Sequence, residues 1–355
     1  MRAILHRRSH NIDTDQTGAT AQIWRRNVRT ATSGHQPTGR VKMKHFNNLL
    51  AAAALSALAL PATAQEIIKV GAFVAEQSTG VAKVIKPWME AVATETNDVK
   101  MMPFWGGTLG KNPFKQFELV QNGVADVTWV LPGYTAGQFP EMGVFELPFL
   151  FRTAEEASVV GWKLHEMGLL TGFDGVHLVG FFAAEPNALF MKKKIASLDD
   201  IANMKVRSVG SIHASWLESL GAAPQTLSSA EMNEGLNRGT VDGAIQGWTG
   251  MKTFKSLPLV DQAYVVPAGA IPFLLLMNEG KWNSLSADAQ TAIMSHGGAK
   301  MAQMGGDAYT DVGESIRKDV VAEGRIEVVT PDQATIEKYA GKAKTVHDAW
   351  IAATP

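Results

Sequence analysis

The sequence contains no cysteine in 355 residues. Without a thiol it forms no disulfide, no thiolate metal site and no cysteine nucleophile. The nine histidines are scattered, with no His-Glu-x-x-His pair, so we expect no metal site. No Gly-x-Ser-x-Gly elbow occurs either. The sequence therefore lacks the signals of the common hydrolases and metalloenzymes, and it indicates no cofactor.

No apolar run is long enough to cross a membrane. The short run Leu49–Leu60 follows Lys44 and precedes Pro61-Ala62-Thr63-Ala64, a pattern typical of a secretory signal peptide. We predict that residues 43–64 are this signal, cleaved after Ala64, and that the mature protein lies in the periplasm. Residues 1–42 are then a mis-assigned start or a disordered leader. The alternative is a genuine cytoplasmic extension, which would weaken export.

An excess of basic residues is also absent. Residues 65–355 hold 24 Lys and Arg against 32 Asp and Glu. Nucleic-acid binding needs a basic surface, so this balance argues against a nucleic-acid partner. The remaining length exceeds that of one typical domain, which favours two lobes.

The first part of the chain alternates strand and helix patterns, as in a parallel α/β unit. Pro87 should kink the first helix or set its start. Ligands of open α/β sheets bind beyond the carboxyl ends of the strands, so we expect site residues in loops 74–79, 105–112 and 129–134. The expected strands are 66–73, 99–105 and 124–131.

A second series of strands and capped helices predicts a second lobe. Residues 270–277 are expected to form a strand that returns to the first lobe, and 286–323 a long helical stretch weakened by glycines. We predict an α/β, two-lobed fold with hinge-crossing strands and a long helix. The predicted boundaries are 65–184 plus about 271–312 for lobe I, and 185–270 plus about 313–355 for lobe II.

Six spaced motifs resemble the DctP-type solute receptors of TRAP (tripartite ATP-independent periplasmic) transporters. The resemblance runs from about residue 66 to the C-terminus. It implies a periplasmic binding protein (Venus-flytrap) fold and no enzymatic turnover. It also implies delivery of an organic acid to small DctQ-type and large DctM-type membrane subunits. The motifs are Phe104–Gly110, Phe145–Phe151, Met204–Gly210, Leu220–Pro224, Ser229–Glu231 and Asn237–Ala244.

Arg207 ends a short expected strand, just before a small-residue loop and a new helix. A guanidinium is a planar fork of donors that suits a carboxylate. From the residue alone, an ordinary ion-paired arginine is the commoner reading. The resemblance places Arg207 where the family arginine holds the substrate carboxylate. Gln246, at the end of the neighbouring expected strand, is expected to fix the ligand's orientation.

Asn187 stands where sialic-acid-binding relatives carry a second arginine. Because asparagine supplies no charge, it favours a monocarboxylate, and we expect it to hydrogen-bond the ligand.

Trp129, Tyr134 and Trp248 are expected to line the tail of the ligand, which favours an organic acid with an apolar or aromatic tail. Each of these rings is equally compatible with the hydrophobic core. Glu76 is expected to meet a ligand hydroxyl or a cation, although such residues more often belong to a solvated loop.

Two other functions stay open at this point. A periplasmic lyase on the same scaffold would consume the acid, but the sequence shows no acid/base pair for it. A receptor that presents its ligand to a signalling partner would bind without turnover. Adjacent genes for a multi-spanning permease would favour transport over signalling.

Overall fold

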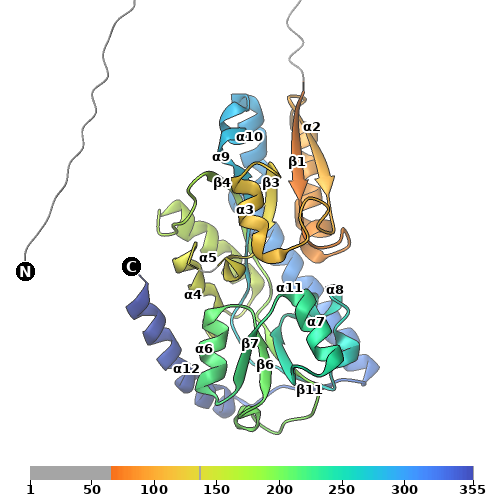
Figure 1. Ribbon diagram of the computed structural model, residues 1–355, viewed down its shortest axis with the longest axis vertical. Coiled ribbons are helices and arrows are strands. Elements are labelled where there is room, and N and C mark those ends of the chain that lie inside the picture. The colour runs from red at the N-terminus through yellow and green to blue at the C-terminus, as the bar shows by residue number, and fades with distance from the viewer. Residues whose placement is uncertain (1–64, 136, 355) are drawn as a thin grey trace, which may run out of the picture. The chain divides into compact units, whose positions relative to one another are not determined.

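The computed structural model describes residues 65–135 and 137–354. The predicted leader, signal peptide and cleavage after Ala64 lie outside the described residues. The chain folds into a two-lobed α/β structure with two sheets (Figure 1). In the described part, no helix combines the length and apolar character needed to span a membrane.

The first sheet has five strands in the order β2-β1-β3-β10-β4. β1 is parallel to β2 and to β3, which confirms the predicted parallel unit. β10 inserts antiparallel between β3 and β4, so the predicted return strand is also confirmed. The strands span Glu66–Gly71 (β1), Val99–Phe104 (β2), Val127–Val130 (β3), Val176–Ala183 (β4) and Pro272–Asn278 (β10).

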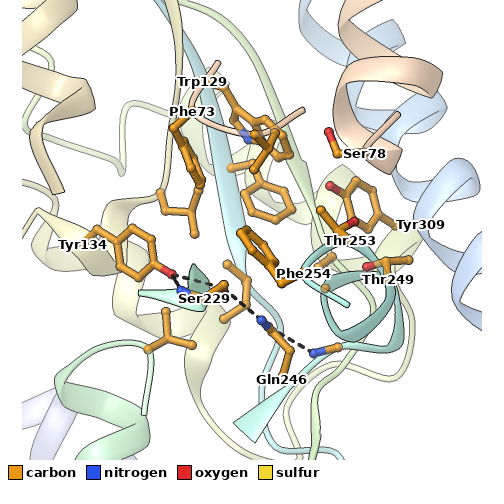
Figure 2. A pocket seen from close by; sticks show the side chains of 18 of the residues that line it. Phe73, Ser78, Trp129, Tyr134, Ser229, Gln246, Thr249, Thr253, Phe254 and Tyr309 are labelled. Atoms are coloured by element: carbon orange, nitrogen blue, oxygen red, sulfur yellow. Dashed lines mark hydrogen bonds between the residues drawn. The ribbon is translucent and has the colours of Figure 1, made fainter. Parts of the chain in front are cut away.

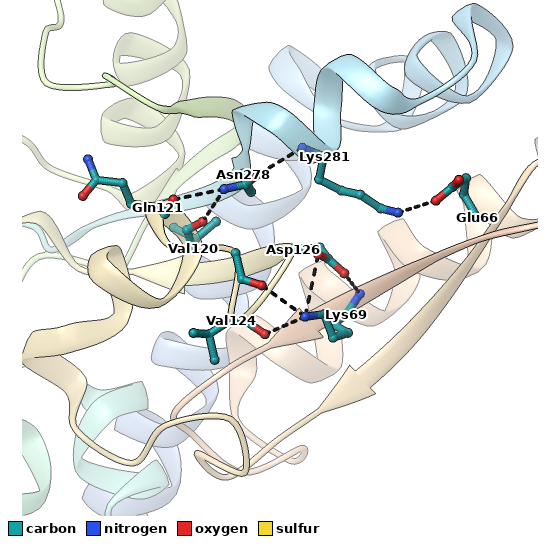
Figure 3. A network of polar contacts seen from close by, with 9 residues as sticks. Glu66, Lys69, Val120, Gln121, Val124, Asp126, Asn278 and Lys281 are labelled. Atoms are coloured by element: carbon teal, nitrogen blue, oxygen red, sulfur yellow. Dashed lines mark hydrogen bonds and ion pairs between the residues drawn. The ribbon is translucent and has the colours of Figure 1, made fainter. Parts of the chain in front are cut away.

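Polar contacts hold the C-terminal end of β10 in place within the first sheet (Figure 3). Asn278 Oδ1 accepts from Lys281 N at 2.9 Å, and its Nδ2 donates to Val120 O at 3.0 Å. One side chain thus caps the start of helix α9 (Glu279–Ser284) and satisfies a carbonyl near the end of helix α3 (Gln116–Gln121). In β1, Lys69 N donates to Asp126 Oδ2, just before β3, at 2.7 Å. The contact between Asn278 and Val120 joins residues 158 positions apart in the chain.

The second sheet has six strands in the order β11-β9-β5-β8-β6-β7. β6 is parallel to β7 and β8, and Arg207 pairs with Ala244 of β8, as expected. β7, β9 and β11 are not among the strands predicted from the sequence; they have four, three and three residues. The strands span Ala188–Met191 (β5), Lys205–Ser208 (β6), Ala223–Thr226 (β7), Gly243–Gln246 (β8), Gln262–Tyr264 (β9) and Glu327–Val329 (β11).

Several helices begin with a side-chain cap: Thr153 accepts from Glu156 N and Ser228 from Glu231 N. A π-helical segment, Val81–Ile85, precedes α2, which carries Pro87 in its first turn; the proline therefore sets the start of the regular helix. The predicted long stretch is two helices, α10 and α11, divided at Gly297. The helices are Lys86–Glu95 (α2), Gln116–Gln121 (α3), Gly143–Glu146 (α4), Ala154–Glu166 (α5), Ser211–Ser219 (α6), Ser229–Arg238 (α7), Trp248–Thr253 (α8), Glu279–Ser284 (α9), Ala287–His296 (α10), Gly298–Glu323 (α11) and Gln333–Ala353 (α12).

Three segments connect the two sheets. The five-stranded sheet and the helices around it form the first lobe, and the six-stranded sheet and its helices form the second lobe. Residues 184–187 lead from β4 to β5, and 265–271 lead back from β9 to β10. These two segments bond to each other: Asn187 N donates to Gly269 O at 2.8 Å, and Ala184 N to Ile271 O at 2.9 Å. Helix α11 contacts β4 and α5 of the first lobe and α8 of the second. The numerical lobe boundaries given above remain a prediction.

Apolar side chains cover both faces of each sheet. In β5, Leu189 and Met191 belong to one buried cluster of the second lobe, while Ala188 and Phe190 belong to the other. Such a strand has no polar face because helices cover both sides of the sheet. Both sheets are thus packed on both faces. The segments between the lobes join the ends of β4 and β5 and the ends of β9 and β10.

Candidate functional site

Side chains from both lobes line one cavity of about 50 Å³ (Figure 2). Most of its wall is apolar, with a few polar groups and one formal charge, the guanidinium of Arg207. None of the described lining residues is Asp, Glu, His or Lys. The lining residues are Phe73, Val74, Ser78, Trp129, Leu131, Tyr134, Ala184, Arg207, Val209, Ser229, Gln246, Gly247, Thr249, Gly250, Thr253, Phe254, Ile271, Phe273 and Tyr309.

Arg207 is fully buried at the end of β6. Its Nε donates to Leu227 O at 2.8 Å, and Nη1 donates to Ile245 O at 2.9 Å. These two backbone carbonyls hold the guanidinium plane in the second lobe. A guanidinium has five N–H donors, so both terminal nitrogens keep donors for groups at the cavity. The backbone, and not an acidic side chain, positions this arginine.

The charge of Arg207 has no carboxylate partner within ion-pair distance in residues 65–135 and 137–354. Burial lowers the pKa of Arg207, while Tyr134 and Glu146 act in the opposite direction. Arginine stays protonated even so. A buried cation that is hydrogen-bonded but not neutralised is costly, and an anionic ligand would offset that cost.

The nearest buried acid, Glu146, is a weak counter-ion. Burial raises its pKa to about 7, against the lowering effect of Arg207. Its Oε2 lies 3.5 Å from Nδ1 of His213, and burial lowers the pKa of that histidine to about 3. His213 is therefore neutral, and near pH 7 a substantial fraction of Glu146 is protonated. The arrangement leaves Arg207 open to another anion.

A hydrogen-bonded chain crosses between the lobes beside Arg207 (Figure 2). The Tyr134 hydroxyl accepts from Arg207 Nη2 at 3.1 Å and from Ser229 N at 2.9 Å. Gln246 Nε2 donates to Ser229 Oγ at 2.9 Å. Ser229 is the first residue of α7, whose N–H has no partner within the helix. Tyr134 of the first lobe thus closes against three polar groups of the second.

The opposite wall is aromatic and comes from the first lobe. The Trp129 ring lies 4.9 Å from Phe273 in an edge-on arrangement, 5.8 Å from Phe182 and 5.9 Å from Phe73, measured between centroids. Such a cluster holds its rings in place by mutual packing. This wall offers a large apolar area to a ligand tail.

The structure brings four of the predicted residues to the cavity: Arg207, Gln246, Trp129 and Tyr134. Two of the three predicted loops contribute, 74–79 and 129–134, and loop 105–112 does not.

Three predicted residues lie outside the cavity lining. Trp248 is buried and packs edge-on against Phe190, with centroids 4.9 Å apart, in the core of the second lobe. Asn187 lies in segment 184–187, which connects the two lobes, and its Nδ2 donates to Gly269 O at 2.9 Å. The Glu76 side chain is exposed and pairs with Lys86 at 2.5 Å.

The lining residues that are not among the site residues predicted from the sequence include Ser229, Phe273 and Tyr309. Ser229 directly follows the capping residue Ser228, so its place in the first helical turn near Arg207 was accessible to pattern reasoning. Tyr309 lies in the middle of α11 and Phe273 in β10, far along the chain. Only the fold brings these two to Trp129.

The comparisons with known proteins agree with this architecture. Residues 70–353 match the family DctP, described as bacterial extracellular solute-binding protein, family 7. Among curated relatives, the "Outer membrane transporter protein TsaT" of Comamonas testosteroni is 26% identical over 316 residues, which cover 87% of this chain and 93% of the relative.

Two solved structures of TRAP solute-binding proteins are similar throughout. One, from a marine metagenome, is described as specific for aromatic acid ligands and contains 3-hydroxybenzoate; it is 27% identical, with a TM-score of 0.77, and the match covers 81% of this chain and 92% of that one. The other, from Rhodoferax ferrireducens T118, contains copurified benzoate; it is 26% identical, with a TM-score of 0.75, and the match covers 81% and 91%.

Proposed function

This chain belongs to the DctP family of bacterial extracellular solute-binding proteins, and from that premise we propose that it is the periplasmic receptor of a TRAP transporter for a small monocarboxylic acid. Arg207 binds the carboxylate. Gln246 and Ser229 orient it, and the aromatic wall of the first lobe receives an apolar or ring-bearing tail. The receptor then delivers the acid to DctQ-type and DctM-type membrane subunits.

The observation that carries the proposal is the buried, unneutralised guanidinium of Arg207 at a cavity with no other formal charge. A carboxylate that enters beside it can accept a charge-assisted hydrogen bond from the remaining N–H of Nη1 and offsets the cost of burying the cation. A second carboxylate would meet only aromatic and neutral polar groups. A monocarboxylate therefore suits this lining better than a dicarboxylate.

A tail with an aromatic ring fits the chemistry of the first-lobe wall, and relatives of known structure contain benzoate and 3-hydroxybenzoate. A cavity of 150 Å³ is known to hold benzene, whereas this one encloses about 50 Å³. A ring-bearing acid therefore requires the walls to move apart. The two hinge segments 184–187 and 265–271 allow such a movement as lobe opening, and ligand contacts in both lobes favour closure.

Binding is favoured over turnover by the same lining. Lyase chemistry needs a positioned acid and base at the reacting atoms, and the described lining residues provide only hydroxyls, an amide, an indole and a guanidinium.

Thermal melting of the purified protein against paired ligands tests the proposal. Benzoate at a hundred times its Kd should stabilise by about 2.7 kcal/mol, a shift of several degrees, whereas the neutral benzamide should give none. Arg207→Ala should lose the response while it still folds cooperatively. Arg238→Ala, at an exposed arginine paired with Glu234, is the matched control and should respond as the wild type does. An unchanged response in Arg207→Ala contradicts the proposed clamp.

A further inference from the structure

The first-lobe wall of the cavity contains two polar atoms without a hydrogen-bond partner in the described structure, Ser78 Oγ and Trp129 Nε1. Both side chains are almost fully buried, with 3% of each residue exposed. Other buried atoms of the described chain also lack partners, but these two belong to residues that line the cavity. Buried donors are usually paired, so a ligand that enters the cavity is the natural partner for them.

The indole has little freedom to find another partner. It is packed among Phe273, Phe182 and Phe73. On its open edge, the backbone of Gly80 approaches so closely that an added Cβ would lie 2.5 Å from Trp129 Cη2. The segment of Ser78 is fixed as well, because Ala82 N donates to Ser78 O at 2.9 Å. Both groups are therefore held beside the cavity before any ligand arrives.

The two groups lie across the cavity from the carboxylate site. Figure 2 places Trp129 and Ser78 on one side of Phe254, and Ser229 with Gln246 on the other. Arg207 belongs to the latter side, since its Nη2 lies 3.4 Å from Ser229 Oγ. A ligand held by Arg207 thus directs its remote end toward the indole and the hydroxyl.

We propose that Trp129 and Ser78 recognise an uncharged oxygen at the remote end of the acid, so that the receptor selects hydroxylated, ring-bearing monocarboxylates over unsubstituted ones. This inference rests on the proposed function and specifies its substrate class. The indole N–H only donates, whereas the serine hydroxyl donates and accepts, a combination that suits a phenolic or alcoholic hydroxyl. A charged oxygen is disfavoured because the described residues that form this wall include no cation.

Isothermal titration calorimetry with matched ligands tests the inference. The better of 3- and 4-hydroxybenzoate should bind the wild type at least about tenfold more tightly than benzoate, and the methyl-substituted analogue of the same shape should show no such gain. In Trp129→Phe and in Ser78→Ala the ratio of hydroxylated to methylated affinity should fall to about two or less. Trp216→Phe is the matched control, because Trp216 is another fully buried indole without a partner, remote from the cavity lining; it should keep the wild-type ratio.

Two outcomes overturn the inference in different ways. Equal affinity for hydroxylated and methylated acids, or an unchanged ratio in both variants, removes the role of Trp129 and Ser78 but leaves Arg207-dependent binding of benzoate intact. Failure of every acid to bind the wild type contradicts the proposed function as well. If Trp129→Phe does not fold, Ser78→Ala alone still decides the question.

Discussion

The two walls of the cavity differ in chemistry, since hydrogen bonds hold one together and aromatic packing holds the other. The second-lobe wall is a polar network in which Arg207, Ser229 and Gln246 are fixed by hydrogen bonds to backbone and to one another. The first-lobe wall is an aromatic cluster around Trp129, fixed by packing. Tyr134 is the exception, because it brings a hydroxyl from the first lobe to the polar side.

This division explains how a receptor can couple binding to closure. Charge recognition on one lobe and shape recognition on the other mean that neither lobe alone makes all the contacts. A ligand then binds the closed form more tightly than the open one, and only such a difference in affinity shifts the equilibrium between them. The comparison predicts that changes in the two walls have distinguishable consequences.

The largest effect is expected from Phe273→Ala, in the aromatic wall. Phe273 contacts Trp129, Phe182 and Tyr309, so its truncation should lower the free energy of unfolding by about 3–5 kcal/mol. Urea unfolding measures this loss. Affinity for benzoate should fall further than affinity for acetate; an equal loss for both acids would mean that this wall does not contact the ligand tail.

The next effect concerns the hinge carboxyl Glu185, behind the polar wall. Its oxygens accept from Thr249 N at 2.8 Å and from Thr249 Oγ1 at 3.0 Å, yet burial raises its pKa from 4.5 to about 7. Between these values the folded protein holds a proton that the unfolded chain has released. Stability is therefore lost as the pH rises through this window, by about 3 kcal/mol for this group.

The variant Glu185→Gln isolates that contribution. The difference in unfolding free energy between variant and wild type should move in favour of the variant from pH 5 to pH 8. A difference that stays constant across this range shows that Glu185 is ionised throughout. Because Glu146 titrates in the same window and is present in both proteins, the subtraction removes it.

A smaller effect is expected from Tyr134→Phe, which deletes the hydroxyl that joins the walls. Two donors, Arg207 Nη2 and Ser229 N, lose their acceptor, so stability should fall by about 1–2 kcal/mol. Tyr339→Phe is the matched control, because the Tyr339 hydroxyl is buried without a partner and its removal should cost little. Equal losses in both variants would argue against the cross-lobe contact.

The smallest effect is expected from Glu76→Gln, outside both walls. Glu76 forms an exposed pair with Lys86, and exposed pairs contribute little. The melting temperature and the Kd for benzoate should stay within experimental error of the wild-type values. A clear loss of affinity in calorimetry would show that Glu76 reaches the ligand in another lobe arrangement.

Much of the fold followed from local sequence signals. Ser228 and Asp332 cap their helices and Gly239 ends one, as these residue types favour, because a cap depends on a few neighbouring residues. The local pattern identifies the glycines of the stretch 286–323 only as weak helix formers, and the stretch does divide at Gly297. A Cβ on Gly305 would lie 2.4 Å from Phe182 Cβ, so this glycine lets the helix approach β4, and no local pattern reveals that.

In the candidate site, too, some features follow from local sequence and others from tertiary packing. The sequence indicated that Arg207 lies at the end of a short strand, since strand periodicity and the turn that follows are local properties. It did not decide that Trp248 faces the core while Trp129 faces the cavity, or that Asn187 serves the hinge. Those outcomes depend on how each element is rotated against partners far along the chain. Only the tertiary structure fixes that rotation, because it depends on packing against residues distant in the chain, such as Phe190 for Trp248 and Phe273 for Trp129.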